Sequence, residues 1–171
     1  MSEASKSKVT IEAPAATVRE LLFDLAGYPS WTTTIKSVTP DETGSDGRPT
    51  KVTMVIDAGV MKDRVTLSYD WSKAPESVSF SLEEADLLTE MTGSYLISDN
   101  GDDTTDVIYE LVVKVSMPVP EMMRKKTEQS TVDLALSQLK KHRQNLLMHH
   151  KKKDLFRAQN LEKILLINHK Q

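Results

Sequence analysis

The sequence predicts an α+β domain in which one antiparallel sheet is covered by one long helix. Two observations support this. Strand-like segments with alternating apolar and polar residues fill the middle of the chain, and the only long helical pattern follows them, from residue 121 to about residue 142. A period of two buries one face of a sheet and leaves the other face in water. Because a sheet with one apolar face needs a cover, we expect it to curl around this helix.

The chain opens with a predicted strand and two short helices. Lys8–Ala13 alternates as a strand, and Ala15–Ala26 carries apolar residues at helical spacing. Gly27 is well placed as the C-cap of this helix, and a Tyr-Pro pair follows it. We expect residues 30–35 to form one short second helical turn.

Six more strands are predicted, separated by turns rich in Gly and Asp such as ETGSDGRP at residues 42–49. With the first strand they make a curved sheet of about six to seven strands. Their predicted bounds are Lys36–Pro40, Thr50–Ala58, Asp63–Trp71, Ser77–Leu82, Thr89–Ser98 and Thr105–Ser116.

The C-terminal part divides into the long helix and a tail. Prolines just before residue 121 favour a helix start there. We expect one domain over residues 1–143 and a basic tail over residues 144–171, in which residues 154–167 have helical spacing. The apolar pattern over residues 144–153 is weak.

Charge is distributed unequally between these parts. Residues 1–139 carry 13 Lys and Arg against 23 Asp and Glu, a net −10, whereas residues 140–171 carry 9 against 2, a net +7. An acidic body is a poor nucleic-acid binder, since phosphate contacts need a basic surface. The chain has no Cys, no signal-peptide pattern and no apolar run long enough to span a bilayer. We therefore expect a soluble, cytoplasmic protein.

Two segments carry a family resemblance. They are the opening VTIEAPAATVRELLFDLAGYPSW and the helix PVPEMMRKKTEQSTVDLALSQLKKH. With the strands between them, residues 6–143 resemble the START-like superfamily, the helix-grip or SRPBCC proteins, which include the polyketide cyclase/dehydrase and lipid-transport family and coenzyme Q-binding proteins. The resemblance implies a helix-grip fold whose sheet and C-terminal helix enclose an apolar cavity.

The resemblance also implies which residues bind a ligand. The inward strand residues would line the cavity, the first turns of the long helix would close it, and Trp31 would lie near one mouth. Ordinary core packing is the alternative for each of them. The candidate ligand-binding residues are Trp31, Met54, Ile56, Leu67, Tyr69, Phe80, Leu82, Met91, Tyr95, Tyr109, Leu111, Val113, Met122, Met123, Arg124 and Thr127.

No catalytic residue, metal or cofactor is predicted. All four His lie at or after residue 142, outside the predicted sheet, which argues against His-based catalysis or metal binding in the cavity. The first function hypothesis is therefore the binding or transport of a hydrophobic small molecule such as a lipid, a quinone or a polyketide-like compound.

Two alternatives remain open. One is a polyketide cyclase or dehydratase acting in the same cavity, with Tyr69, Tyr95, Arg124, Asp63 or Glu90 handling protons. The other is an interaction protein of the ribosome-association type, which the basic tail keeps open. The tail also predicts contact with a membrane surface or a second copy of the chain.

Overall fold

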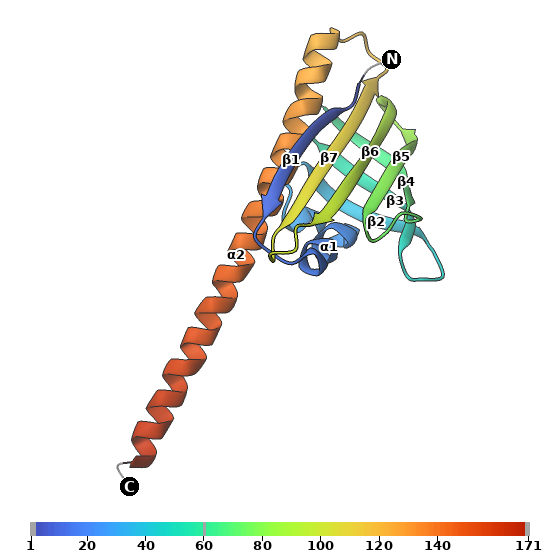
Figure 1. The fold of residues 1–171 in the computed structure, drawn as a ribbon. Coiled ribbons are helices and arrows are strands. Elements are labelled where there is room, and N and C mark those ends of the chain that lie inside the picture. Colours follow the sequence, from blue (N-terminus) through green and yellow to red (C-terminus); the bar gives the residue numbers. More distant parts are fainter. Residues whose placement is uncertain (1–2, 60, 170–171) are drawn as a thin grey trace. The chain divides into compact units, whose positions relative to one another are not determined.

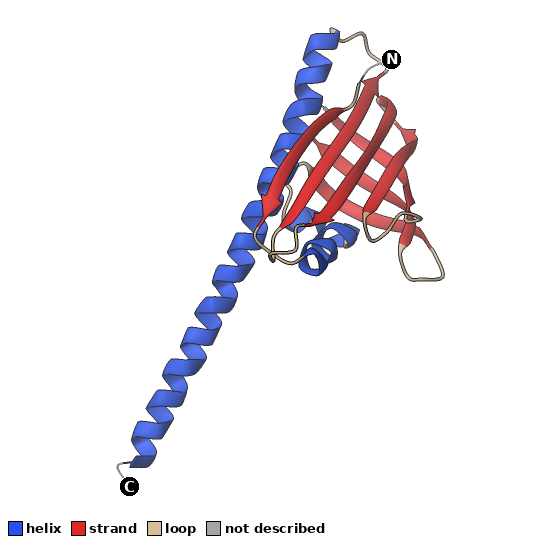
Figure 2. Cartoon of the chain, in the orientation of Figure 1, coloured by secondary structure: helices blue, strands red, loops and turns tan. Residues whose placement is uncertain are grey.

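The computed structural model describes residues 3–59 and 61–169. Seven strands form one antiparallel sheet in the order β1-β7-β6-β5-β4-β3-β2 (Figures 1 and 2). The strands are β1 Ser5–Ile11, β2 Ile35–Thr43, β3 Pro49–Asp57, β4 Lys62–Asp70, β5 Ser77–Ala85, β6 Leu88–Asp99 and β7 Thr105–Val115; the helices are α1 Ala15–Phe23, the 3₁₀-helix η1 Leu25–Ser30 and α2 Glu121–His169. The α+β helix-grip prediction is confirmed.

The chain separates into two compact units, residues 1–140 and residues 141–171. In the first unit, the sheet is curved and the α2 residues up to 140 lie on its concave side (Figure 1). The second unit is helical through residue 169, including residues 144–153, where the sequence pattern is weak. Its Leu155, Phe156 and Leu165 are exposed.

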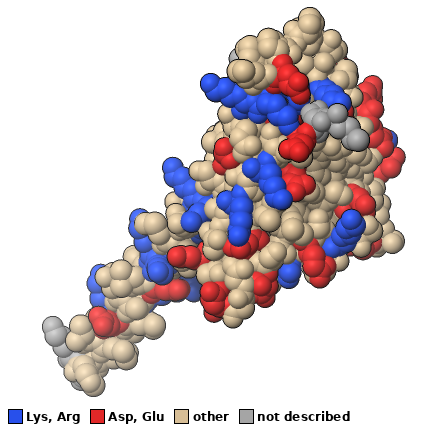
Figure 3. Space-filling model, turned by 45° about the horizontal axis from the view of Figure 1, so that its top comes forward, with Lys and Arg blue, Asp and Glu red and all other residues tan. Residues whose placement is uncertain are grey.

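Strand alternation places the core as predicted. In β4 the buried side chains are Asp63, Val65, Leu67 and Tyr69, and the residues between them face outward. Outward residues form cross-strand ion pairs, such as Lys114 Nζ with a Glu90 carboxylate oxygen at 3.1 Å. Figure 3 shows acidic and basic side chains interspersed on the face in view. The inner face of the sheet is therefore free to form the core and the site.

The start of the chain differs from the prediction. The first helix ends at Phe23, because Asp24 has a non-helical backbone (φ −85°, ψ 82°). The predicted second turn lies earlier, as η1, and it contains Pro29. A 3₁₀-helix accommodates this proline because η1 is short and few of its backbone N–H groups need internal partners.

Strands β2, β5 and β6 are longer than predicted. The β2 strand continues to Thr43, through residues that resemble a turn, because it pairs with β3 across register shifts near Pro40 and Glu42. The tight turn is confined to the residues between Thr43 and Pro49, where Gly47 has φ +83°.

No helix within residues 3–59 and 61–169 contains a stretch long and apolar enough to cross a membrane.

Candidate ligand cavity

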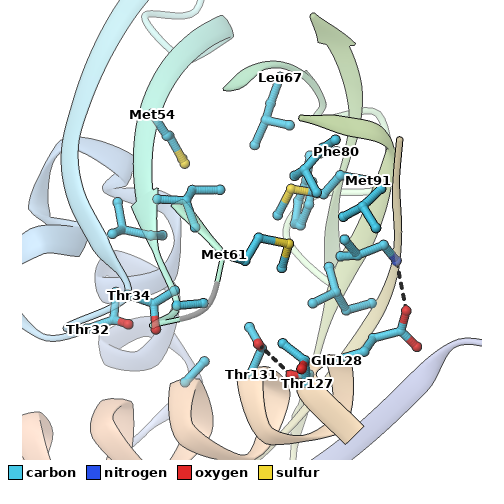
Figure 4. Close-up of a pocket in the computed structure, with 18 of the residues that line it drawn as sticks. Thr32, Thr34, Met54, Met61, Leu67, Phe80, Met91, Thr127, Glu128 and Thr131 are labelled. Atoms are coloured by element: carbon cyan, nitrogen blue, oxygen red, sulfur yellow. Dashed lines mark hydrogen bonds between the residues drawn. The ribbon is translucent and has the colours of Figure 1, made fainter. Parts of the chain in front are cut away.

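A cavity of about 250 Å³ lies between the concave face of the sheet and the first part of α2. Most of its lining is apolar, and Figure 4 shows side chains from the sheet and from α2 pointing into it. The α2 contribution is one helical face: Met123, Thr127, Thr131 and Ala135 recur every fourth residue. The structure thus provides an open space where a filled core was the alternative.

Methionine is the commonest flexible residue of this lining. Met54, Met61, Met91, Met117 and Met123 all contribute. An unbranched thioether side chain adapts to irregular shapes, so this lining suits guests of variable outline.

Four tyrosines gather at the end of the cavity near η1, and we call Tyr28, Tyr69, Tyr95 and Tyr109 the tyrosine cluster. Tyr95 and Tyr109 pair across β6 and β7, and their rings stack with centroids 4.2 Å apart. Tyr28 reaches in from η1 and donates its hydroxyl hydrogen to the carbonyl oxygen of Leu22. Burial raises the pKa of all four hydroxyls above the ordinary value near 10. They are therefore neutral hydrogen-bond donors at physiological pH.

The opposite end of the cavity is a mouth formed by three chain connections and the first turn of α2. We define the mouth as Ala58, Met61, Leu87, Met117, Val119 and Met123. Met117 and Met123 are exposed, whereas the tyrosine cluster is buried. The cavity therefore has a closed inner end with hydroxyl groups and an apolar opening.

The charged groups of the lining are Arg124 and Glu128, which neutralise each other. Arg124 Nη1 donates to Glu128 Oε2 at 2.9 Å and to the carbonyl oxygen of Val113 at 2.8 Å. Glu128 also accepts a bond from the Ser5 hydroxyl at 2.6 Å. A further bond to Glu128 comes from the Val113 amide at 2.8 Å (Figure 4). This fully buried carboxylate joins β1, β7 and α2, and it offers no uncompensated charge to a ligand.

Asp63 is a second buried carboxylate, and it is also fully engaged. Its Oδ1 accepts bonds from the amides of Arg64 and Asp86, and its Oδ2 accepts bonds from the amides of Leu87 and Leu88, all at 2.8–3.0 Å. It holds the turn between β5 and β6 at the mouth. Its side chain is not part of the cavity lining.

Fourteen of the sixteen predicted residues line the cavity. Met122 does not, because it points away from the face of α2 that carries Met123 and is 83% exposed. Leu82 does not either: it packs against the core beside a register shift in the β4–β5 pairing. The fourteen are Trp31, Met54, Ile56, Leu67, Tyr69, Phe80, Met91, Tyr95, Tyr109, Leu111, Val113, Met123, Arg124 and Thr127.

Sequence reasoning missed several lining residues. Glu128 was detectable as a carboxylate four residues after Arg124 on the same helix face, a spacing that favours an ion pair. Thr32 and Thr34 lie in the connection to β2, and Met61 and Leu87 lie in turns, where no periodic pattern reports which way a side chain points (Figure 4).

The two tryptophans have different environments. The Trp71 indole donates to the carbonyl oxygen of Pro49 at 2.8 Å, so its position is explained by packing. Trp31 lines the cavity, is 7% exposed, and packs edge-on against Tyr28. Its Nε1 is buried and has no hydrogen-bond acceptor among the residues that the structure describes.

Metal binding finds no support in this geometry. Across residues 3–59 and 61–169, no group of three or more Asp, Glu or His side chains is placed to hold a metal ion. The four His lie outside the cavity lining.

A curved antiparallel sheet, a helix along its concave face and an apolar cavity between them define a protein with the helix-grip fold. The chain belongs to the polyketide cyclase / dehydrase and lipid transport family, whose sequence model matches residues 3–143. A comparison with curated proteins gave no match.

Solved structures share the fold at low sequence identity. A START superfamily protein from Mycobacterium smegmatis is 23% identical with a TM-score of 0.80, and the match covers 85% of this chain and 99% of that one. A protein from Thermus thermophilus is 19% identical with a TM-score of 0.70, covering 81% and 94%. The Zhui aromatase/cyclase from a Streptomyces species is 17% identical with a TM-score of 0.63, covering 81% and 88%. At these identities the likeness shows the fold alone.

Proposed function

We propose that this protein binds or carries a hydrophobic small molecule in the cavity between the sheet and α2. The observation that carries the proposal is the open cavity of about 250 Å³ where the concave face of the sheet meets α2. Buried apolar surface stabilises a guest by about 25 cal/mol per Å² before the costs of association, so an apolar cavity of this kind favours an apolar guest. A lipid, a quinone or a polyketide-like molecule fits this description.

Catalysis in the same cavity is the second candidate, as a polyketide cyclase or dehydratase. One feature of the tyrosine cluster favours catalysis, because neutral hydroxyl groups can polarise a carbonyl group. Proton transfer is less well provided for, because Asp63 and Glu128 are engaged by several donors each and Glu90 pairs with Lys114 outside the cavity. The geometry of the cavity therefore supports ligand binding better than it supports catalysis of a cyclisation.

The experiment is a titration with Nile red, a neutral dye that fluoresces in apolar surroundings. We expect saturable uptake by the wild-type chain. Leu111→Trp places a large side chain in the cavity and should weaken uptake at least tenfold. Glu110→Trp is the matched control, since Glu110 is the adjacent β7 residue, is half exposed and pairs with Lys6 outside the core.

The outcome is decided by the comparison of these two variants. If both take up the dye like the wild type, or if the wild type takes up none, the binding proposal is wrong. Native mass spectrometry of protein purified without detergent would then identify any natural guest by its mass.

Three narrower hypotheses rest on the sequence alone. They are cytoplasmic localisation, contact of residues 144–171 with a membrane surface or a second copy, and association with ribosomes. Neither the structure nor the comparisons support the last two. Truncation after Gln144 tests the contact hypothesis. Unchanged oligomer mass and unchanged liposome binding would show that residues 144–171 contact neither a second copy nor a membrane surface.

A further inference from the structure

The cavity has two chemically different ends, and this difference bears on the ligand. Strand β4 runs from Lys62, next to the mouth residue Met61, to Tyr69 of the tyrosine cluster. Seven residue steps of a strand span about 23 Å. A ligand that occupies the length of the cavity therefore places one end among hydroxyl groups and the other among methionines.

One buried hydrogen-bond donor at the inner end lacks a partner. The Trp31 indole N–H has no acceptor among the described residues. Tyr69 lines the same end of the cavity, and its burial keeps the hydroxyl protonated and able to donate. By contrast, the Tyr28 hydroxyl is committed to Leu22. An unsatisfied buried donor is unfavourable, so an acceptor supplied by a ligand would be bound preferentially.

The inner end of the cavity has no charged residue in its described lining. The charged lining residues Arg124 and Glu128 belong to α2 and are bonded to each other and to Val113. A ligand carboxylate or phosphate placed among the tyrosines would be desolvated without a counter-ion, which is strongly unfavourable.

We propose that the ligand enters with an uncharged, oxygen-bearing end directed inward, where the Tyr69 hydroxyl and the Trp31 indole donate to a carbonyl or ether oxygen. Its apolar part then lies along Met54 and Met91 toward the mouth. This inference deepens the proposed binding function and rests on it. It narrows the ligand class from hydrophobic molecules in general to neutral molecules with an acceptor at one end, which disfavours free fatty acids and phospholipid headgroups at the inner end.

The test uses a matched pair of probes, 9-fluorenone and fluorene, which share one tricyclic skeleton and differ in a carbonyl group. Competition against bound Nile red gives both affinities. We expect the wild type to bind fluorenone about three- to tenfold more tightly than fluorene, the worth of one hydrogen bond. Tyr69→Phe or Trp31→Phe should bring this ratio close to one. Fluorene-9-carboxylate should compete at least tenfold more weakly than fluorenone.

A control variant separates donor loss from general damage. Trp71→Phe removes an indole that is already bonded to Pro49 and does not line the cavity. We expect this control to have a lower melting temperature than the wild type and to keep its ratio of the two affinities. Because each variant is compared with itself across two probes, changes in stability cancel.

The outcomes distinguish the two proposals. Loss of the ratio in Tyr69→Phe or in Trp31→Phe, with the ratio kept in Trp71→Phe, supports the inference. A wild-type ratio near one, a ratio unchanged in both variants, tight binding of the carboxylate, or failure of both neutral probes to displace Nile red overturns the inference and leaves the binding function standing. Failure of the wild type to take up Nile red contradicts the binding function, and the inference falls with it.

Discussion

The ring of Phe80 lies over Gly93, its partner on the neighbouring strand. A Cβ atom at residue 93 would come within 2.4 Å of Phe80 Cζ and 3.0 Å of the Glu110 carbonyl oxygen. The absence of a side chain at Gly93 thus allows the Phe80 ring to pack directly against the sheet. Since Phe80 lines the cavity, this missing side chain sets part of the cavity's shape.

Gly93→Ala should therefore push the Phe80 ring into the cavity. We expect Nile red affinity to fall several-fold and the free energy of unfolding to fall by about 1–3 kcal/mol, as for other overpacked cores. The measurements are dye titration and urea unfolding. Ser94→Ala, the next residue along β6, is the control. Full dye affinity in Gly93→Ala would show that Phe80 does not shape the site.

Glu128 should be required for stability through its partners. Glu128→Ala leaves the Ser5 hydroxyl and the Val113 amide without their acceptor, and it removes the buried carboxylate that pairs with the Arg124 guanidinium. Removing one member of a buried ion pair costs about 3–5 kcal/mol, which urea unfolding would detect. A double-mutant cycle with Arg124→Met should show strong coupling, because the two residues share one interaction. Additive effects in the cycle would contradict the ion pair.

Asp63 should control the mouth without touching the ligand. Asp63→Asn removes one of the two oxygens that accept bonds from the amides of Asp86, Leu87 and Leu88. We expect faster hydrogen exchange at residues 86–88 and a loss of about 1–3 kcal/mol in the free energy of unfolding, the usual cost of unsatisfied buried amides. Unchanged exchange at these three amides would mean that the turn is held by something else.

Alkaline pH should report on the tyrosine cluster, since its four members are all the tyrosines of the chain. Their pKa values are raised in the folded state by burial. In the unfolded chain they ionise near pH 10, so the stability they contribute is complete below pH 10 and is lost as the pH rises above it. Tyrosinate absorbance at 295 nm should stay flat past pH 10 and rise together with loss of structure. A gradual rise in the folded protein would contradict their burial.

The sheet could be predicted from the sequence because the alternation of apolar and polar residues is a local pattern that shows which face of each strand is buried. Once Leu67 and Tyr69 are assigned to one face, the cover that α2 must provide follows from burial alone. The buried position of Glu128 could not be predicted in this way. Its partners Ser5 and Val113 are distant in sequence, so only the folded chain reveals that a carboxylate can be satisfied in a core.

The position of Trp31 in the cavity is a second feature that the sequence did not predict. A Trp after Tyr-Pro predicted a mouth residue, yet Trp31 packs against Tyr28 and belongs with the buried end of the cavity. The connection from η1 to β2 decides its direction, and no periodic pattern describes that connection.

Methionine methyl resonances test the central claim most directly. The chain has methionines in the cavity lining, including Met54 and Met91, and others outside it, Met122 and Met148. With ¹³C-methyl labelling and assignment by substitution, added 9-fluorenone should shift Met54 and Met91 and leave Met122 and Met148 unchanged. Shifts confined to Met122 and Met148, or no shifts at saturating probe, would contradict binding in the cavity.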